Sequence, residues 1–367
     1  MKITRIDVYQ ISYRLLDEKY AWAKGHSVSS FLSTIVKIST DEGLTGYGEV
    51  CPLGSTYMEA YSEGIPKGIE KLGPALIGKD PRQINAINSL MDLILKGHNY
   101  IKSPIDMACW DIFGKAVGLP VCTLLGGKMM DNYLLYRAIS QGSPEEMVDK
   151  VARFREEGYS RFQLKVGGNP DDDIKRIKAV LQVVQSEDIV IADANTGWLS
   201  CEALKVVNTF KGGEVYIEQP CASLEECLII RQYTSSPFVL DEIITGVPSL
   251  LRAHGHQAMD IVNLKISRIG GLTKTKQLRD LCQSLGIAVT IEDSWGGDIA
   301  TTAIAHLVGS TDPKYFFTST DFNSYIDIQI AEDAPRREKG KIRVPDKPGL
   351  GINVNEKILG NPILTIK

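Results

Sequence analysis

The sequence predicts a parallel β/α barrel preceded by a smaller α+β domain. The first supporting observation is a series of short apolar runs that each end in a charged residue, such as RFQLK, IVIAD, VYIE and FVLD. Such a run is typical of a buried strand that ends where solvent or a ligand begins. The charged residues are Lys165, Asp193, Glu218, Asp241, Lys265, Asp293 and Asp321.

The second observation is the even spacing of these residues. Successive gaps are 28, 25, 23, 24, 28 and 28 residues, and each gap accommodates one strand, one helix and two loops. A chain that repeats this unit forms a parallel barrel, whose catalytic groups lie at the carboxyl ends of several strands. The same residues therefore predict both the fold and the location of the site.

Composition narrows the classes of function. The 367 residues are enough for a barrel of about 250 residues and a second domain. A net charge of −4 argues against a nucleic-acid partner, and no run of about 20 apolar residues predicts a membrane span. No signal-peptide pattern opens the sequence, and the seven cysteines lack a C-x-x-C pair, so we expect a cytoplasmic protein with reduced thiols.

The first 126 residues do not follow the repeat and predict an α+β domain. Alternating patterns predict an antiparallel meander, and apolar faces predict helices, the last of which has Ser103 as N-cap before Pro104. The expected strands cover 1–10, 31–39 and 44–50, and the expected helices 61–76, 84–95 and 103–117. The barrel is expected over 127–325, and a final segment, 326–367, should return to the first domain through the Pro/Gly-rich stretch 341–352.

Within the barrel, NYLLYRAIS at 132–140 is the expected first strand. Helices are expected between strands. The helix over 144–157 has Ser143 as N-cap and Glu146 three residues later, which is a capping box. Further helices are expected over 171–186 and 224–234.

Three consecutive strand ends carry carboxylates: Asp193, Glu218 and Asp241. Adjacent strands lie about 4.8 Å apart, so carboxylates at equal height should converge. Their mutual repulsion would be relieved by a divalent cation, and an all-oxygen ligand set favours Mg²⁺, with Mn²⁺ as the alternative. The competing interpretation is three solvated acids at the starts of loops.

Lys165 and Lys265 flank these carboxylates, one unit before and one unit after, and should face each other across the metal. A lysine that lies near a cation and is shielded from water loses its proton more easily, so it can act as a base. The competing interpretation is that both lysines only neutralise the acids.

Five motifs occur in order: QLK at 163–165, DANTGW at 193–198, IEQP at 217–220, LDE at 240–242 and LKISRIGG at 264–271. With them the chain resembles the muconate lactonizing enzyme subgroup of the enolase superfamily. The resemblance implies a modified (β/α)7β TIM barrel under an α+β capping domain.

The resemblance also implies site residues: Mg²⁺ ligands at Asp193, Glu218 and Asp241, and acid/base lysines at 165 and 265. Asn195 and Glu242 are expected to support the ligands. The chain departs from the pattern at Gln163, where the family usually has lysine. Gln163 can hydrogen-bond a carboxylate but adds no charge to depress the pKa of Lys165.

Family chemistry implies removal of the proton α to a carboxylate, which gives an enediolate. Two opposed lysines favour an isomerase, a racemase or epimerase, because the proton can return on the other face. Departure of a β leaving group would instead make the enzyme a lyase, a dehydratase. The motifs do not separate these outcomes.

The seventh strand ends in IEDSWGGD, which places Asp293 and Trp295 at the barrel mouth. An acid beside an indole suits a cationic substrate. Trp22, Tyr20 and Tyr57 lie in capping-domain segments expected to cover the mouth, although each aromatic could be a simple loop anchor.

The QLK and EDSWGGD combination is similar to that of hydroxyproline betaine and proline betaine 2-epimerases. It implies a small carboxylate substrate that is cationic at nitrogen, such as an N-substituted proline. The alternatives are a cis-3-hydroxyproline-type dehydratase, a dipeptide epimerase and a catalytically inactive structural homologue. The resemblance further implies a homo-oligomer.

Overall fold

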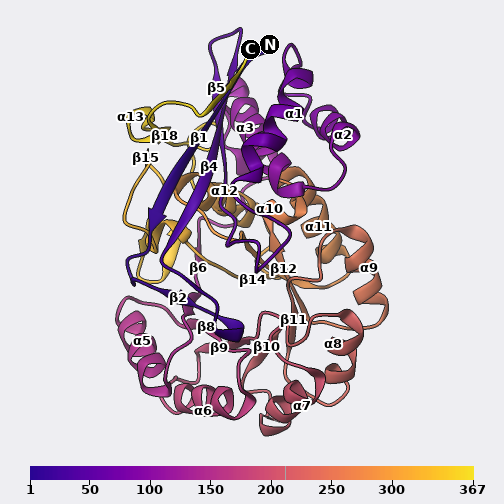
Figure 1. Cartoon of the computed structure of the whole chain (residues 1–367), viewed down its shortest axis with the longest axis vertical. Coiled ribbons are helices and arrows are strands. Elements are labelled where there is room, and N and C mark those ends of the chain that lie inside the picture. The colour runs from indigo at the N-terminus through magenta and orange to yellow at the C-terminus, as the bar shows by residue number, and fades with distance from the viewer. Residues whose placement is uncertain (211) are drawn as a thin grey trace.

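The computed structural model describes residues 1–210 and 212–367. At its centre an eight-stranded parallel sheet, in the order β14-β13-β12-β11-β10-β9-β8-β7, curves within a ring of helices (Figure 1). The N–H of Tyr136, next to β7, donates to the carbonyl of Ser319 in β14 at 2.8 Å, so the first and last strands meet. The strands are β7 (Arg137–Ile139), β8 (Arg161–Lys165), β9 (Ile189–Asp193), β10 (Tyr216–Glu218), β11 (Phe238–Leu240), β12 (Ile261–Lys265), β13 (Ala288–Glu292) and β14 (Phe316–Ser319).

Helices follow the barrel strands, as the spacing predicts. The capping box of α5 is present: Ser143 Oγ accepts from the Glu146 N–H, and the Glu146 carboxylate accepts from the Ser143 N–H. No helix in the described part of the chain is long and apolar enough to cross a membrane. The helices are α5 (Pro144–Glu156), α6 (Pro170–Leu181), α7 (Ser200–Thr209), α8 (Leu224–Arg231), α9 (Val247–Gly255), α10 (Ile266–Ile269), α11 (Leu272–Ser284) and α12 (Asp298–Gly309).

The capping domain is built on an antiparallel sheet in the order β19-β1-β4-β5, which confirms the expected meander. Its strands are β1 (Ile3–Arg14), β4 (Ser30–Thr40), β5 (Thr45–Val50) and, from the other end of the chain, β19 (Leu364–Ile366). Three helices pack beside it, α1 (Gly64–Leu76), α2 (Ile84–Ile94) and α3 (Asn99–Val117). A short hairpin of β2 (Tyr20–Ala21) and β3 (Ser27–Val28) descends toward the barrel (Figure 1).

The expected start of the third helix at Ser103 is wrong. Helix α3 begins at Asn99, after His98 in the left-handed region (φ 50°), so Ser103 and Pro104 lie inside the helix. Pro104 removes one backbone hydrogen bond. Burial of Tyr100 and Ile101 stabilises the extra turn.

The expected first barrel strand is divided in two. Its first half, β6 (Asn132–Leu134), pairs instead with β17 (Lys341–Arg343) in a small sheet completed by β16 (Arg337–Glu338). The chain then turns into β7, because the N–H of Leu135 donates to Gly340 while that of Tyr136 donates to Ser319.

The stretch 341–352 therefore reaches the capping domain only in its second half. There the N–H of Gly349 donates to the Leu119 carbonyl and that of Leu350 donates to Asp111 Oδ1 at 2.8 Å.

Helix α3 lies so close to β5 that Gly48 has no room for a side chain. A Cβ at Gly48 would lie 1.9 Å from the Pro104 carbonyl oxygen. Gly48→Ala is therefore expected to lower the free energy of unfolding by about 3 kcal/mol, as measured by urea denaturation. Gly255→Ala is the matched control, because nothing lies within 4 Å of its added Cβ. Equal stability of the two variants would contradict this packing.

Candidate active site

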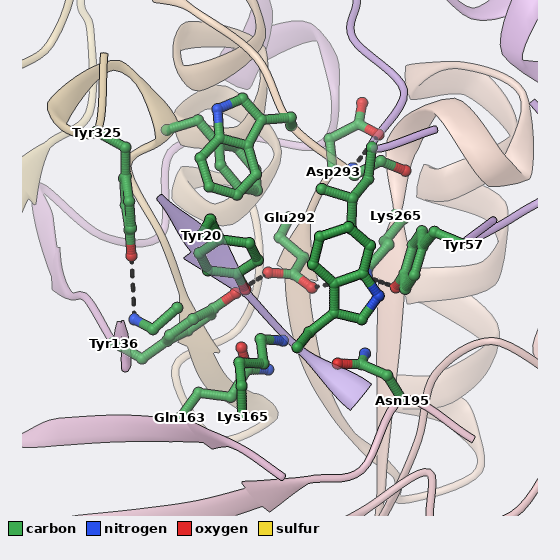
Figure 2. A pocket seen from close by; sticks show the side chains of 16 residues that line it. Tyr20, Tyr57, Tyr136, Gln163, Lys165, Asn195, Lys265, Glu292, Asp293 and Tyr325 are labelled. Atoms are coloured by element: carbon green, nitrogen blue, oxygen red, sulfur yellow. Dashed lines mark hydrogen bonds and ion pairs between the residues drawn. The ribbon is translucent and has the colours of Figure 1, made fainter. Parts of the chain in front are cut away.

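A small, partly enclosed cavity lies at the carboxyl ends of the barrel strands, beneath the β2–β3 hairpin and the segment after β5 (Figure 2). All five residues expected to bind substrate line it, namely Tyr57, Gln163, Asp293, Trp295 and Trp22, as do both lysines. The remaining lining residues are Tyr20, Leu53, Tyr136, Ala138, Asn195, Glu292, Ser294, Phe322 and Tyr325.

Strand register determines how the acids meet. Lys165, Asp193 and Glu218 are partners in adjacent strands, and Lys165 Nζ forms an ion pair with Asp193 Oδ2. The partner of Glu218 in β11 is Val239, so Asp241 follows two residues later, in the loop. The expectation of equal height is therefore wrong for Asp241, because neighbouring strands in a barrel are staggered.

Glu218 is buried and accepts from two side-chain amides. Gln163 Nε2 donates to Glu218 Oε2 at 2.8 Å, and Asn263 Nδ2 donates to Glu218 Oε1 at 3.0 Å. Burial, followed by repulsion from Asp193 and Asp241, raises the pKa of Glu218 well above its ordinary value. Gln163 thus occupies the position the family usually gives to lysine and donates a neutral hydrogen bond to the carboxylate cluster.

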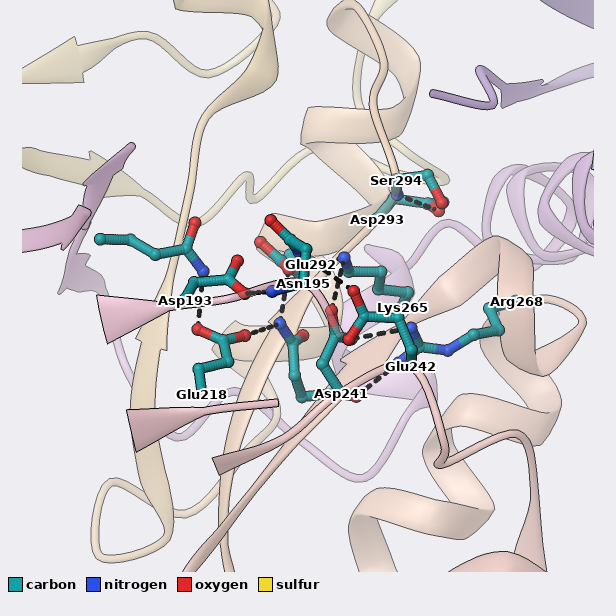
Figure 3. A network of polar contacts seen from close by, with 12 residues as sticks. Asp193, Asn195, Glu218, Asp241, Glu242, Lys265, Arg268, Glu292, Asp293 and Ser294 are labelled. Carbon is teal, nitrogen blue, oxygen red and sulfur yellow. Dashed lines mark hydrogen bonds and ion pairs between the residues drawn. The ribbon is translucent and has the colours of Figure 1, made fainter. Parts of the chain in front are cut away.

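Asp241 is contacted by three side chains, two of which, Lys265 and Arg268, are labelled in Figure 3. Its Oδ2 accepts from the Tyr57 hydroxyl and from Lys265 Nζ, each at 2.9 Å, and its Oδ1 lies 2.7 Å from Arg268 Nη1. Burial alone would raise the pKa of Asp241, but Arg268 and Lys265 outweigh it and hold the pKa well below its ordinary value. Arg268 was missed by the sequence reasoning, although it lies inside the LKISRIGG motif.

Asn195 and Glu242 lie together beside the carboxylates (Figure 3). Asn195 Nδ2 donates to Glu242 Oε1 at 3.0 Å, and the Asn195 N–H donates to Asp193 Oδ1 at 2.9 Å. Burial, with repulsion from Asp241 and Asp193, raises the pKa of Glu242 to about 8. Its second carboxylate oxygen is buried without a hydrogen-bond partner.

Within residues 1–210 and 212–367, no three His, Cys, Asp or Glu side chains are already grouped as a metal site. Lysine and arginine cations instead pair with Asp193 Oδ2 and with both carboxylate oxygens of Asp241. The three acids nevertheless suit a hard cation, because their donor atoms are oxygens. The repulsion from Asp193 and Asp241 that raises the pKa of Glu218 is also the repulsion that a bound cation relieves. The residues therefore fit Mg²⁺.

Both lysines are buried against acids. Burial lowers the pKa of the Lys165 ammonium, but Asp193 outweighs burial and keeps that pKa well above its ordinary value. The pKa of Lys265 is likewise raised, since Asp241 and Glu292 outweigh burial. The Lys265 ammonium also donates to the Tyr57 hydroxyl.

Glu292 is an acid that the sequence reasoning missed. Strand β13 ends at Glu292 rather than at Asp293, and Glu292 is the register partner of Lys265. Its Oε1 accepts from Asn263 Nδ2 at 2.6 Å and lies 3.5 Å from Lys265 Nζ, while its Oε2 accepts from the Tyr136 hydroxyl.

Asp293 lies in the cavity wall with both oxygens engaged. One accepts from the Ser267 hydroxyl and the Ser294 N–H, and the other from the Ser267 N–H at 3.1 Å. Burial outweighs these hydrogen bonds and raises the pKa of Asp293 to about 6. Asp321, by contrast, is buried away from the cavity and accepts from the Tyr159 hydroxyl at 3.2 Å.

Aromatic rings form one wall of the cavity. Trp295 stacks on Phe31 with ring centroids 4.2 Å apart, and Tyr20, Phe322 and Tyr325 surround it at 5.1, 5.2 and 5.4 Å. The rings therefore anchor their loops and line the cavity at once.

The loop that carries Asp293 and Trp295 is fixed by Glu49, a fully buried carboxylate of the capping domain. Glu49 Oε1 accepts from the Gly297 N–H at 2.8 Å and from the Tyr13 hydroxyl at 2.7 Å, and its Oε2 accepts from the Ala300 N–H at 2.9 Å. Glu49 thus caps the start of α12.

A parallel barrel whose strand ends carry lysines and carboxylates, closed over by a second domain, is the architecture of an enzyme for small ligands. Residues 21–126 match the family "Mandelate racemase / muconate lactonizing enzyme, N-terminal domain", and residues 146–358 match "Enolase C-terminal domain-like". The chain belongs to the mandelate racemase/muconate lactonizing enzyme family of the enolase superfamily, which confirms the family and the fold inferred from the motifs.

Similar proteins include isomerases and a lyase, in agreement with the predicted enzyme classes. The chain is 53% identical over 363 residues to the cis-3-hydroxy-L-proline dehydratase of Roseibium aggregatum, covering 99% of each chain. It is 31% identical to the N-succinyl-L-Arg/Lys racemase of Bacillus cereus, covering 98% of this chain and 97% of the racemase. A mandelate racemase/muconate lactonizing enzyme from Roseovarius nubinhibens, complexed with magnesium, superposes with a TM-score of 0.96 at 35% identity and covers 100% of both chains.

Proposed function

We propose that the chain is a cis-3-hydroxy-L-proline dehydratase. The observation that carries this proposal is the 53% identity, along 99% of both chains, to an enzyme of that name. This identity favours the dehydratase over the betaine epimerase that the QLK and EDSWGGD motifs predict.

The proposed reaction follows from the residues that line the cavity. Lys165 or Lys265, in its uncharged amine form, takes the proton from C2, and the electron pair moves into the substrate carboxylate as an enediolate. The pair then forms the C2=C3 bond while the C3–O bond breaks, and the departing hydroxyl takes up a proton and leaves as water. The resulting cyclic enamine tautomerises to an imine.

Asp193, Glu218 and Asp241, supported by Asn195 and Glu242, are the proposed holders of Mg²⁺, with Mn²⁺ as the alternative. When bound, the ion offsets the negative charge that develops on the substrate carboxylate. Gln163 orients Glu218 through its hydrogen bond at 2.8 Å. Tyr57, Trp22, Trp295 and Asp293 enclose the substrate ring.

A second candidate is 2-epimerisation of an N-substituted proline or a betaine. It is favoured by the presence of both lysines in one cavity, since a proton removed by one could be replaced by the other. The two reactions share the enediolate and differ only in whether C3 carries a leaving group.

The test is incubation in D₂O with Mg²⁺ and a panel of cis-3-hydroxy-L-proline, L-proline and L-proline betaine. Exchange at C2 is followed by NMR, and the cyclic imine is followed with an aromatic amine–aldehyde reagent. We expect imine only from the hydroxylated substrate. Inversion of the betaine without imine formation would favour the second candidate, and no exchange with any compound would contradict both.

A further inference from the structure

Glu292 lies between two groups that can move a proton (Figure 2). On one side its Oε1 is 3.5 Å from Lys265 Nζ, and on the other its Oε2 accepts from the Tyr136 hydroxyl. Asn263 Nδ2, 2.6 Å from Oε1, anchors the carboxylate. Tyr136 is 3% exposed and Glu292 is 2% exposed, and both line the cavity.

Dehydration needs an acid as well as a base. Hydroxide is a poor leaving group, so the C3 oxygen must be protonated as its bond to carbon breaks. The lysine that removes the α-proton lies at C2, next to C3. A separate proton donor near C3 would let this lysine act only as the base.

Four tyrosine hydroxyls face the cavity or its rim, and each of them has a polar partner. The hydroxyl of Tyr57 donates to Asp241, and that of Tyr20 contacts Lys165. That of Tyr325 accepts from the Ala138 N–H at 3.0 Å and lies 3.2 Å from the Thr320 hydroxyl. Tyr136 differs, because its proton is held by a carboxylate outside the proposed metal ligands.

We propose that Tyr136 is the catalytic acid that protonates the departing C3 hydroxyl, and that Glu292 is its positioning residue. The inference rests on the proposed dehydratase function. The O–H bond of Tyr136 breaks and its proton joins the C3 oxygen. The C3–O bond breaks, water leaves, and the enediolate electron pair closes C2=C3. The phenolate then recovers a proton from the Lys265 ammonium through Glu292, and when Lys265 is the base at C2 this proton is the α-proton itself.

The surroundings of Tyr136 agree with this role. Burial, with the adjacent Glu292 carboxylate, raises the pKa of Tyr136 well above its ordinary value. The phenol is therefore protonated before the reaction, as a proton donor must be, and the charge that develops on the C3 oxygen has to draw the proton from it.

Tyr136→Phe tests the proposal, because it removes one hydroxyl and keeps the ring. We expect imine formation from cis-3-hydroxy-L-proline to fall about 100-fold or more. Exchange at C2 of L-proline, which has no leaving group, should fall far less, so the ratio of dehydration to exchange drops. Glu292→Gln, which keeps a carbonyl acceptor for Tyr136, should lower this ratio by a smaller factor.

Tyr325→Phe is the matched control. Any effect of this change should fall equally on dehydration and on exchange, so the ratio of the two should stay the same. Parallel loss of both activities in Tyr136→Phe would indicate a merely structural tyrosine and overturn the inference, and so would unchanged dehydration. Failure of the proposed function is a distinct result, since the wild-type enzyme would then form no imine from cis-3-hydroxy-L-proline.

Discussion

Lys165→Ala and Lys265→Ala are each expected to lose C2 exchange with one enantiomer of proline, by about 10³-fold or more, and to lose opposite enantiomers. The reason is that each ammonium approaches the shared cavity from its own strand, β8 or β12. Exchange of D- and L-proline in D₂O, measured by NMR, reads the two faces separately.

Lys274→Ala is the control for the loss of a cation. Lys274 pairs with Asp92 outside the cavity and should leave both exchanges unchanged. Loss of the same enantiomer in both active-site variants would contradict the assignment of one lysine to each face.

Removal of the divalent cation is expected to abolish exchange and dehydration, and addition of Mg²⁺ should restore them. A second readout is thermal unfolding, because an ion that binds only the folded state stabilises it by about 2.7 kcal/mol at 100 times its dissociation constant. Glu218→Gln should lose this stabilisation, since it removes one of the three negative charges that would attract the ion.

Glu225→Gln is the matched control, because Glu225 pairs with Arg252 on an exposed surface. It should keep the full Mg²⁺-dependent rise in melting temperature. A Glu218→Gln protein that is stabilised by Mg²⁺ as strongly as the wild type would contradict the proposed ligand set.

Much of the site could be predicted because successive side chains of a barrel strand point alternately to the hydrophobic core and to the cavity. In β8, Phe162 and Leu164 join the hydrophobic core while Gln163 and Lys165 line the cavity. The same parity in β13 selects Glu292, which shares the inward face with Thr290. The prediction chose Asp293 because it relied on the end of the apolar run rather than on parity.

Other features had no local signal. Tyr136 lies at the cavity because β6 and β7 are separated by hydrogen bonds to Gly340 and Ser319, both far along the chain. The position of Asp241 along the barrel axis depends on the stagger between neighbouring strands. This stagger is a property of the whole barrel. Spacing alone could therefore predict which residues lie together at the site, but not which side chain each of them contacts.

The Glu49 contact has a consequence for how this protein can be recombined with its relatives. The capping domain and the loop before α12 cannot be exchanged independently of each other. The buried Glu49 carboxylate of the capping domain holds that loop through two backbone N–H groups. A chimera that takes its capping domain from a relative without an acceptor at position 49 would leave the N–H groups of Gly297 and Ala300 buried and unsatisfied. Successful hybrids should therefore exchange residue 49 and the start of α12 as one inherited unit.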